Sequence, residues 1–308
     1  MINRILFKLR TIYIKIKNKF IYAFLPLPHV LSIEETIRRI TKDNLSICRF
    51  GDGEMELMHG LSLNFQKHEP ELALRLRQAI LSKKCLVCIP DIFSEKSFDS
   101  ITENSKTFWL NHRNIYLSSY AMLLKGGTYG NAHISRFYIR YKDKTSRGSM
   151  VELLKTIWEG RDITFIEGEE SRLGVGNDLF DNARRIQRIL CPKTDAFNIY
   201  QQILNHAIKM PVSSLFILAL GPTATCLAAD LAERGFQALD LGHVDLEYEY
   251  FLRKSENVIY IAGKHCNEAA IVSSTPQISS RGNIKQEDEQ KYRSQIVVNL
   301  CDVYNSEY

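Results

Sequence analysis

The residues best suited to catalysis lie in the segment 49–54, whose sequence is RFGDGE. They follow a short apolar run, residues 45–50, which we expect to be a buried strand. Asp52 and Glu54 would then stand where this strand ends, at the edge where α/β sheets bind ligands. Two carboxylates at this spacing can direct oxygens at one hard cation such as Mg²⁺ or Mn²⁺, which commonly bridges a protein to a diphosphate. We therefore take Asp52 and Glu54 as candidate metal ligands and catalytic residues.

Three neighbouring residues could complete such a site. Gly51 and Gly53 allow the backbone to turn tightly and to approach a bound ligand closely. Arg49 could either pair with a phosphate or hold one of the carboxylates in place. The competing interpretation, which the spacing alone supports equally well, is an acidic turn in which Asp52 caps the next helix.

A second acidic segment, residues 242–250 (GHVDLEYEY), follows another expected strand. His243, Asp245 and Glu247 alternate there, so they would share one face of an extended segment. In a helix, His243 and Glu247 would still be neighbours. The pattern predicts His243 as a further metal ligand and Asp245 or Glu247 as a general base. Taken alone, the segment favours the alternative of a helix whose first turn is rich in acids because of the macrodipole.

The segment 221–225 (GPTAT) is a candidate phosphate site. It begins an expected helix after a buried strand, and free N–H groups at such a position favour an anion. Gly221 would form the turn, and Thr223 or Thr225 could add a hydroxyl. The segment lacks both the lysine of a P-loop and the spacing of a dinucleotide fingerprint. A threonine that caps the helix explains the pattern equally well.

Several further polar residues lie in loops, and each has a structural explanation at least as good as a functional one. Arg172 and Asn177, in the glycine-rich segment 167–178, could contact a nucleotide or sugar, or could belong to an ordered surface loop. The other candidates are His133, Arg136, Asn267 and Glu268.

Strand-like and helix-like segments alternate through most of the chain. The clearest unit is a buried strand over 214–220, a helix ending near Gly235, and a strand over 237–241, a βαβ pattern that predicts a parallel sheet. Further strands are expected over 85–89, 163–166 and 259–262, and helices over 32–41, 70–84, 98–112 and 149–159. We expect one α/β domain, residues 32–308, with a Rossmann-like, mostly parallel sheet flanked by helices. Residues 118–147 resist assignment.

The positive charge of the chain is concentrated at its N-terminus. The net charge is +5, but residues 1–33 hold six basic residues and no acid, so the remainder carries −1. This distribution argues against nucleic acid as a partner. On a helix, seven apolar residues would form one narrow face: Ile2, Leu6, Leu9, Tyr13, Ile16, Phe20 and Phe24. We predict an amphipathic extension, residues 1–31, whose residues 1–25 lie on an anionic membrane. The alternatives are docking on its own domain or on a second copy of the chain, and a frayed tail.

The composition is that of an ordinary globular protein. With 308 residues, 45% of them hydrophobic, the chain can bury a sizeable core. No apolar run is long enough to span a bilayer, and Pro26 and Pro28 interrupt the stretch that a signal peptide would need. Seven scattered cysteines indicate buried thiols in a reducing compartment; Cys85 and Cys88 have zinc-like spacing but favour core packing. We expect a cytoplasmic protein, peripheral at the inner face of the membrane.

Taken together and in this order, the motifs resemble the GT-D glycosyltransferase family, bacterial enzymes that extend glycans on surface proteins or polysaccharides. The resemblance rests on residues 49–54, 167–178, 220–225 and 238–249, and it covers roughly residues 32–273. It implies a Rossmann-like fold, a nucleotide-sugar donor, commonly UDP-glucose, and a divalent metal, usually Mn²⁺, at Asp52 and Glu54. The N-terminal extension and the residues after about 279 lie outside it.

We therefore expect a metal-dependent glycosyltransferase that moves a hexose from a UDP-linked donor to a glycan acceptor. Asp52 and Glu54 would hold the metal against the diphosphate, and the Gly221 turn or Arg49 would contact phosphate. A carboxylate near Asp245 would deprotonate the acceptor hydroxyl if the reaction inverts configuration. The alternatives are another α/β enzyme that uses nucleotide sugars, such as a hydrolase or phosphotransferase, and a non-catalytic scaffold of glycan assembly.

Overall fold

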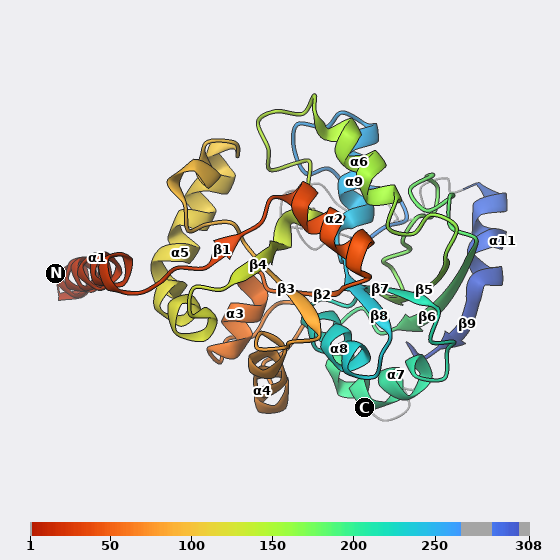
Figure 1. Ribbon diagram of the computed structural model, residues 1–308, viewed down its shortest axis with the longest axis horizontal. Coiled ribbons are helices and arrows are strands. Elements are labelled where there is room, and N and C mark those ends of the chain that lie inside the picture. The colour runs from red at the N-terminus through yellow and green to blue at the C-terminus, as the bar shows by residue number, and fades with distance from the viewer. Residues whose placement is uncertain (1, 266–284, 302–308) are drawn as a thin grey trace.

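Parallel strands joined by helices form the frame of the molecule. The computed structural model describes the backbone of residues 2–265 and 285–301, with side chains from residue 12 onward. Within these ranges nine strands form a sheet in the order β1-β4-β3-β2-β8-β7-β5-β6-β9, and the neighbouring strands run parallel. The expected α/β fold with a parallel sheet is confirmed (Figure 1).

The strands are short and follow one another along the whole chain. Their bounds are β1 His29–Val30, β2 Ser46–Arg49, β3 Cys85–Ile89, β4 Thr128–Asn131, β5 Asp162–Gly168, β6 Arg185–Cys191, β7 Leu215–Ala219, β8 Gln237–Asp240 and β9 Ile296–Asn299. All residues of β3, β7 and β8 are buried. Such continuous burial is expected of strands that helices cover on both faces.

Helices cover both faces of this sheet. Figure 1 shows α2, α6 and α9 on one side and α3, α4, α7 and α8 on the other, with α1 and α5 beyond one end and α11 at the opposite end. Their bounds are α1 Ile2–Phe24, α2 Ile33–Asp43, α3 Asp52–Met58, α4 Pro70–Ala79, α5 Glu103–Leu124, α6 Arg147–Lys155, α7 Tyr200–Ala207, α8 Pro222–Glu233, α9 Val244–Leu252 and α11 Gln286–Gln295. The predicted capping box begins α2, since Ser32 Oγ accepts from Glu35 N at 3.1 Å and Glu35 Oε2 accepts from Ser32 N at 2.8 Å.

The strand order reverses between β2 and β8, at the centre of the sheet. β3 and β4 extend the sheet to one side of β2, whereas β7 and β5 extend it to the other side of β8. The chain leaves β2 into α3 and leaves β8 into α9, and these helices lie on opposite faces (Figure 1). Diverging connections of this kind leave a crevice at the carboxyl edge of a parallel sheet. Both acidic segments identified in the sequence border this crevice.

Several expectations about individual elements were wrong. Residues 259–262, where a strand was predicted, form none. Conversely, β6 and β9 are strands that were not predicted. β6 begins with exposed and half-buried residues, and β9 alternates half-buried with exposed, so neither has the apolar run of a buried strand. The helix expected over 98–112 begins at Glu103 and continues to Leu124, into the stretch that resisted assignment.

The boundary of the N-terminal extension also shifts. α1 is helical as predicted, but β1 follows it and pairs with β4 at the edge of the sheet. Residues 29 and 30 therefore belong to the α/β domain rather than to the extension. Among the described helices, none combines the length and apolarity needed to cross a membrane.

The described cysteines are all buried: Cys48, Cys85, Cys88, Cys191, Cys226 and Cys301. The first five are free thiols. Cys85 and Cys88 lie in β3, where they pack in the core as predicted. Cys266, Asn267 and Glu268 lie outside the described residues.

Candidate active site

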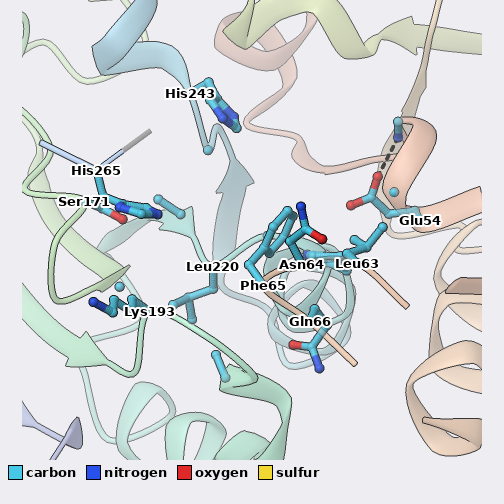
Figure 2. Close-up of a pocket in the computed structure, with 18 of the residues that line it drawn as sticks. Glu54, Leu63, Asn64, Phe65, Gln66, Ser171, Lys193, Leu220, His243 and His265 are labelled. Carbon is cyan, nitrogen blue, oxygen red and sulfur yellow. Dashed lines mark hydrogen bonds between the residues drawn. The ribbon is translucent and has the colours of Figure 1, made fainter. Parts of the chain in front are cut away.

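A cavity of about 430 Å³ opens at the carboxyl ends of β2, β5, β7 and β8. Its walls come from the loops that follow these strands and from residues 62–66, a loop between α3 and α4. Figure 2 shows Glu54 on one side of this pocket, Ser171, Lys193 and His265 on the opposite side, and Phe65 between them. The pocket therefore occupies the crevice that the reversal of strand order creates.

Asp52 and Glu54 are held at the pocket by the first turn of α3. Asp52 is the first residue of the helix, Gly51 is its N-cap, and all three residues line the cavity. Glu54 Oε2 accepts a hydrogen bond from Gly51 N at 2.7 Å, so Glu54, not Asp52, caps this helix. Gly53 also lines the cavity and lies close to Leu63, whose Cδ1 would be 2.9 Å from an added Cβ. The two carboxylates thus share one helix end and one cavity.

The environment of Glu54 disfavours its negative charge. Burial raises the pKa of Glu54 to about 7, and the neighbouring carboxylate of Asp240 adds to the effect, while the Gly51 hydrogen bond and Arg49 oppose it. A positive charge in the pocket would stabilise the ionised form of Glu54. The N-terminus of α3 supplies only a partial positive charge.

Arg49 pairs with Asp240, a residue of the segment 238–249 that was not predicted to belong to the site. Arg49 Nη2 pairs with Asp240 Oδ1 at 2.8 Å, and Arg49 Nε donates to Asp240 O at 2.6 Å. Gly242 makes room for this pair, because a Cβ there would lie 2.8 Å from Arg49 Nη2. Arg49 thus holds the carboxylate of Asp240 rather than that of Asp52 or Glu54, and its contact with a phosphate stays a prediction. Arg49 still lines the cavity.

The turn at Gly221 reaches the pocket, but the threonines after it do not. Gly221 has φ +53° and lies under Phe65, whose Cε2 would be 2.8 Å from an added Cβ. Both threonines are fully buried. Thr223 Oγ1 donates to Gln66 Oε1. Thr225 Oγ1 lies within hydrogen-bond distance of two acceptors, Arg49 O and Asp240 Oδ2. Neither threonine lines the cavity, and both hydroxyls have partners inside the protein, so the phosphate contact predicted for them is not supported by their placement.

The acidic segment of α9 is divided between the pocket and the interior. His243, the residue before the helix, and Asp245 both line the cavity. His243 lies 3.2 Å from Arg136 Nη2, across the pocket from Glu54 (Figure 2). Asp245 Oδ2 accepts from Lys264 Nζ at 2.6 Å, and its Oδ1 accepts from Asn177 Nδ2 at 2.8 Å and from Gly174 N at 3.0 Å. Both oxygens of Asp245 are thus occupied.

Glu247 lies outside the pocket, contrary to its prediction as a candidate base. Its Oε2 accepts from the backbone N–H groups of Tyr138 and Ile139 at 2.7 and 2.9 Å. The side chain is almost completely buried, and burial raises its pKa. Glu247 therefore secures the segment after β4 instead of facing a substrate.

Arg172 and Asn177 also serve the fold. Arg172 pairs with Glu289 of α11 and lies over the Tyr292 ring at 4.6 Å from its centroid. Asn177 bridges Asp245 and Glu249, donating to the latter at 2.7 Å. Neither residue lines the cavity, so their placement gives no support to the predicted contact with a nucleotide or sugar.

The wall opposite the carboxylates carries Lys193 and His265, and sequence reasoning missed both. Each lies beside Glu170, which also lines the cavity: Lys193 Nζ is 2.8 Å from Glu170 Oε1, and His265 Nδ1 is 3.4 Å from Glu170 Oε2. Arg136 lines the cavity beside His243. Lys193 follows β6, a strand that was not predicted. His265 follows the strand expected over 259–262, where only Asn267 and Glu268 were named.

His133 is a core residue. Its side chain is buried and its ring packs near Trp109, and this burial lowers its pKa well below the ordinary value.

The donor set fits a hard divalent cation that is shared with a substrate. Asp52 and Glu54 offer carboxylate oxygens in one cavity, and Mg²⁺ or Mn²⁺ is commonly held by one or two carboxylates plus phosphate oxygens. Within the described part of the chain, no three His, Cys, Asp or Glu side chains converge on one metal position. His243 lies on another wall of the same cavity, beside Arg136, so its predicted role as a metal ligand stays a prediction.

Comparison with known proteins identifies the family. A model of the glycosyltransferase GT-D fold matches residues 47–269. A probable glycosyl transferase of Streptococcus gordonii is 36% identical over 275 residues, which cover 88% of this chain and 39% of that protein. The glycosyltransferase GlyD of Streptococcus pneumoniae serotype 4 is 35% identical over 276 residues, which cover 89% and 33%. The chain thus spans well under half the length of these relatives.

Solved structures share the fold over nearly their whole length. A glycosyltransferase from Streptococcus sanguinis superposes with a TM-score of 0.81 at 36% identity, covering 88% of this chain and 99% of that one. A domain of unknown function described as having a distinct glycosyltransferase fold gives a TM-score of 0.81 at 37% identity, covering 88% and 95%. The chain belongs to the GT-D glycosyltransferase family.

Proposed function

We propose that the chain transfers a hexosyl group, glucose being our first candidate, from a UDP-linked donor to a glycan acceptor in a metal-dependent reaction. The observation that carries this proposal is the pair Asp52 and Glu54, which face one cavity at the reversal point of a parallel sheet in a GT-D family member. Sequence similarity extends over this whole cavity, since the family match includes residues 47–269.

Asp52 and Glu54 would hold Mn²⁺ or Mg²⁺ against the donor diphosphate. When bound, the cation would offset the negative charge that develops on the leaving UDP. The Gly221 turn lines the same cavity at the N-terminus of α8, where the partial positive charge of a helix favours phosphate. Arg136 would add positive charge near the donor, while the charge of Lys193 is shared with Glu170.

Asp245 is the candidate base that lines the cavity, unlike Glu247. To accept a proton from an acceptor hydroxyl, Asp245 would have to release a hydrogen bond to Lys264, Asn177 or Gly174. We therefore propose for Asp245 a role limited to an inverting reaction.

The acceptor and the location are proposals that rest on the family and the composition. We propose a glycan of a surface protein or polysaccharide, and a cytoplasmic enzyme. The buried free thiols support a reducing compartment.

The test is transfer from UDP-glucose with Mn²⁺ to a panel of oligosaccharide acceptors, followed by UDP release and product mass. Asp52→Ala with Glu54→Ala should lower transfer by roughly 10³-fold or more, because both ligands of the cation are removed. The matched control removes two exposed acids of α2, Glu34→Ala with Asp43→Ala, and should retain full activity.

The outcomes separate the alternatives. UDP release that does not depend on an acceptor would indicate a hydrolase, and phosphate transfer would indicate a phosphotransferase. Absence of any thermal shift with UDP-sugars and Mn²⁺ would favour a non-catalytic scaffold, since a bound ligand stabilises the folded state. Full transfer by the double alanine variant would contradict the metal site.

A further inference from the structure

The apolar face of α1 points into solvent, away from the α/β domain. Tyr13, Ile16, Phe20 and Phe24 follow a helical spacing and form one stripe, with Ile12 at its edge. Each of them is exposed, from 53% for Ile12 to 69% for Phe24. An amphipathic helix that docks on its own domain would bury such a stripe. The docking explanation offered by the sequence therefore does not account for these side chains.

α1 is nevertheless fixed to the domain, through a different side of the helix. Ile21 is 4% exposed and packs against Leu117 and Ala121 of α5. Asn18 Nδ2 donates to Asn114 O at 3.1 Å, and Lys17 Nζ donates to Ser118 Oγ at 3.0 Å. The helix is thus held in place with its apolar stripe outward.

Basic residues border this stripe. At about 100° per residue, Lys19 lies about 20° and Lys15 about 60° beyond Ile12, on the side of the helix that is turned away from α5. Both are exposed, and neither has an ion-pair partner among the described residues. The sequence supplies no acid before residue 34 to neutralise them. Exposed aromatic and aliphatic residues flanked by lysines are the pattern of a helix that lies in the headgroup region of a membrane.

We propose that the outward stripe of α1 docks on an anionic lipid surface, with Ile16, Phe20 and Phe24 entering the headgroup boundary and Lys15 and Lys19 contacting lipid phosphates. The stripe is too small for a stable dimer, which usually needs roughly 20 residues or more a side. Its positive flank would also repel a second copy, whereas it attracts an anionic leaflet.

The position of α1 suits this arrangement. α1 lies beyond α5 at one end of the molecule, apart from the elements that line the pocket (Figure 1). On α5, Ile115 and Met122 are also exposed, and each is the chain neighbour of a residue that contacts α1. A membrane that meets this end of the molecule would leave the catalytic crevice open. The inference does not depend on the proposed activity.

The experiment is sedimentation of the full chain with vesicles of equimolar phosphatidylglycerol and phosphatidylcholine, compared with phosphatidylcholine alone. Wild type should bind the anionic vesicles, and less strongly as salt rises from about 0.1 to about 0.5 M. Ile16→Glu with Phe20→Glu should lower the partition coefficient roughly a hundredfold or more. Lys15→Gln with Lys19→Gln should lower it roughly 10- to 30-fold.

A matched control places two glutamates on exposed apolar positions elsewhere, Leu74→Glu with Val212→Glu, and should bind like wild type. Thermal unfolding of each variant shows that the fold is kept. Binding that survives Ile16→Glu with Phe20→Glu, or no wild-type binding to anionic vesicles, would overturn the proposal. So would a wild-type dimer, measured by light scattering, that the same variant converts to a monomer, since the stripe would then serve self-association.

Discussion

Two acidic segments leave neighbouring strands of this sheet, and only one of them remains open to a ligand. Asp52 and Glu54 follow β2 and begin α3, while Asp245 and Glu247 follow β8 and lie in the first turn of α9. The first pair lines the cavity with a single short hydrogen bond from Gly51 to Glu54. The second pair receives hydrogen bonds from side chains and backbone that occupy it.

The difference lies in the donors that the rest of the chain provides. Lys264 and Asn177 reach Asp245 from distant loops, and the backbone after η2 (Ala132–Ser135) reaches Glu247. A buried carboxylate with its own donors stabilises a fold, whereas one without them is destabilising until a cation arrives. An acidic motif at a strand exit therefore indicates a ligand site only where the fold leaves at least part of its carboxylate oxygens without donors.

The largest effect on stability should come from Lys264. Its Nζ lies 2.6 Å from Asp245 Oδ2 and 3.1 Å from Glu249 Oε1, and all three side chains are buried. Lys264→Met would leave the buried carboxylate of Asp245 without a counter-charge and Glu249 with only Arg253, 3.0 Å from its Oε2. We therefore expect a loss of about 3–5 kcal/mol in the free energy of unfolding. Urea denaturation measures it. A loss below about 1 kcal/mol would show that the α9 acids do not depend on internal partners.

A smaller loss is expected at Glu247. Glu247→Ala removes the acceptor of two buried backbone N–H groups, which should lower the free energy of unfolding by about 2–3 kcal/mol. Glu247→Gln keeps an acceptor oxygen and should recover much of this loss. If Glu247→Gln were as stable as wild type but lost transfer activity by orders of magnitude, Glu247 would act as a base. That result would contradict the purely structural role that we assign to Glu247.

The frame of the molecule could be predicted from the sequence because local patterns encode it. The apolar runs at 45–50, 85–89 and 214–220 gave β2, β3 and β7, and the Ser32–Glu35 capping box gave the start of α2. β9 could not be predicted in this way, since its short, half-exposed run depends on pairing with β6 from a distant part of the chain. Lys193 was missed for the same reason, because the strand before it was missed.

The site divides along similar lines. The segment RFGDGE predicted Asp52 and Glu54 as site residues, because glycines and acids at the end of a strand are a local sequence pattern. By contrast, tertiary contacts with residues far away in the sequence determine where the side chains of Thr225, Asn177 and Glu247 point. A single sequence holds no local signal for such contacts, and so it could not separate the acids that face the pocket from those that hold the fold.

The smallest effect on stability, and the most direct test, concerns the open pair. Calorimetric titration of UDP-glucose in the presence and absence of Mn²⁺ should be carried out on wild type and on Asp52→Asn with Glu54→Gln. These isosteric changes should alter the free energy of unfolding by less than about 1 kcal/mol, since neither carboxylate has a buried ionic partner of its own. Wild type should bind the donor in a Mn²⁺-dependent way, and the variant should lose at least about tenfold in affinity. Equal donor affinity in both proteins, with and without Mn²⁺, would contradict the account.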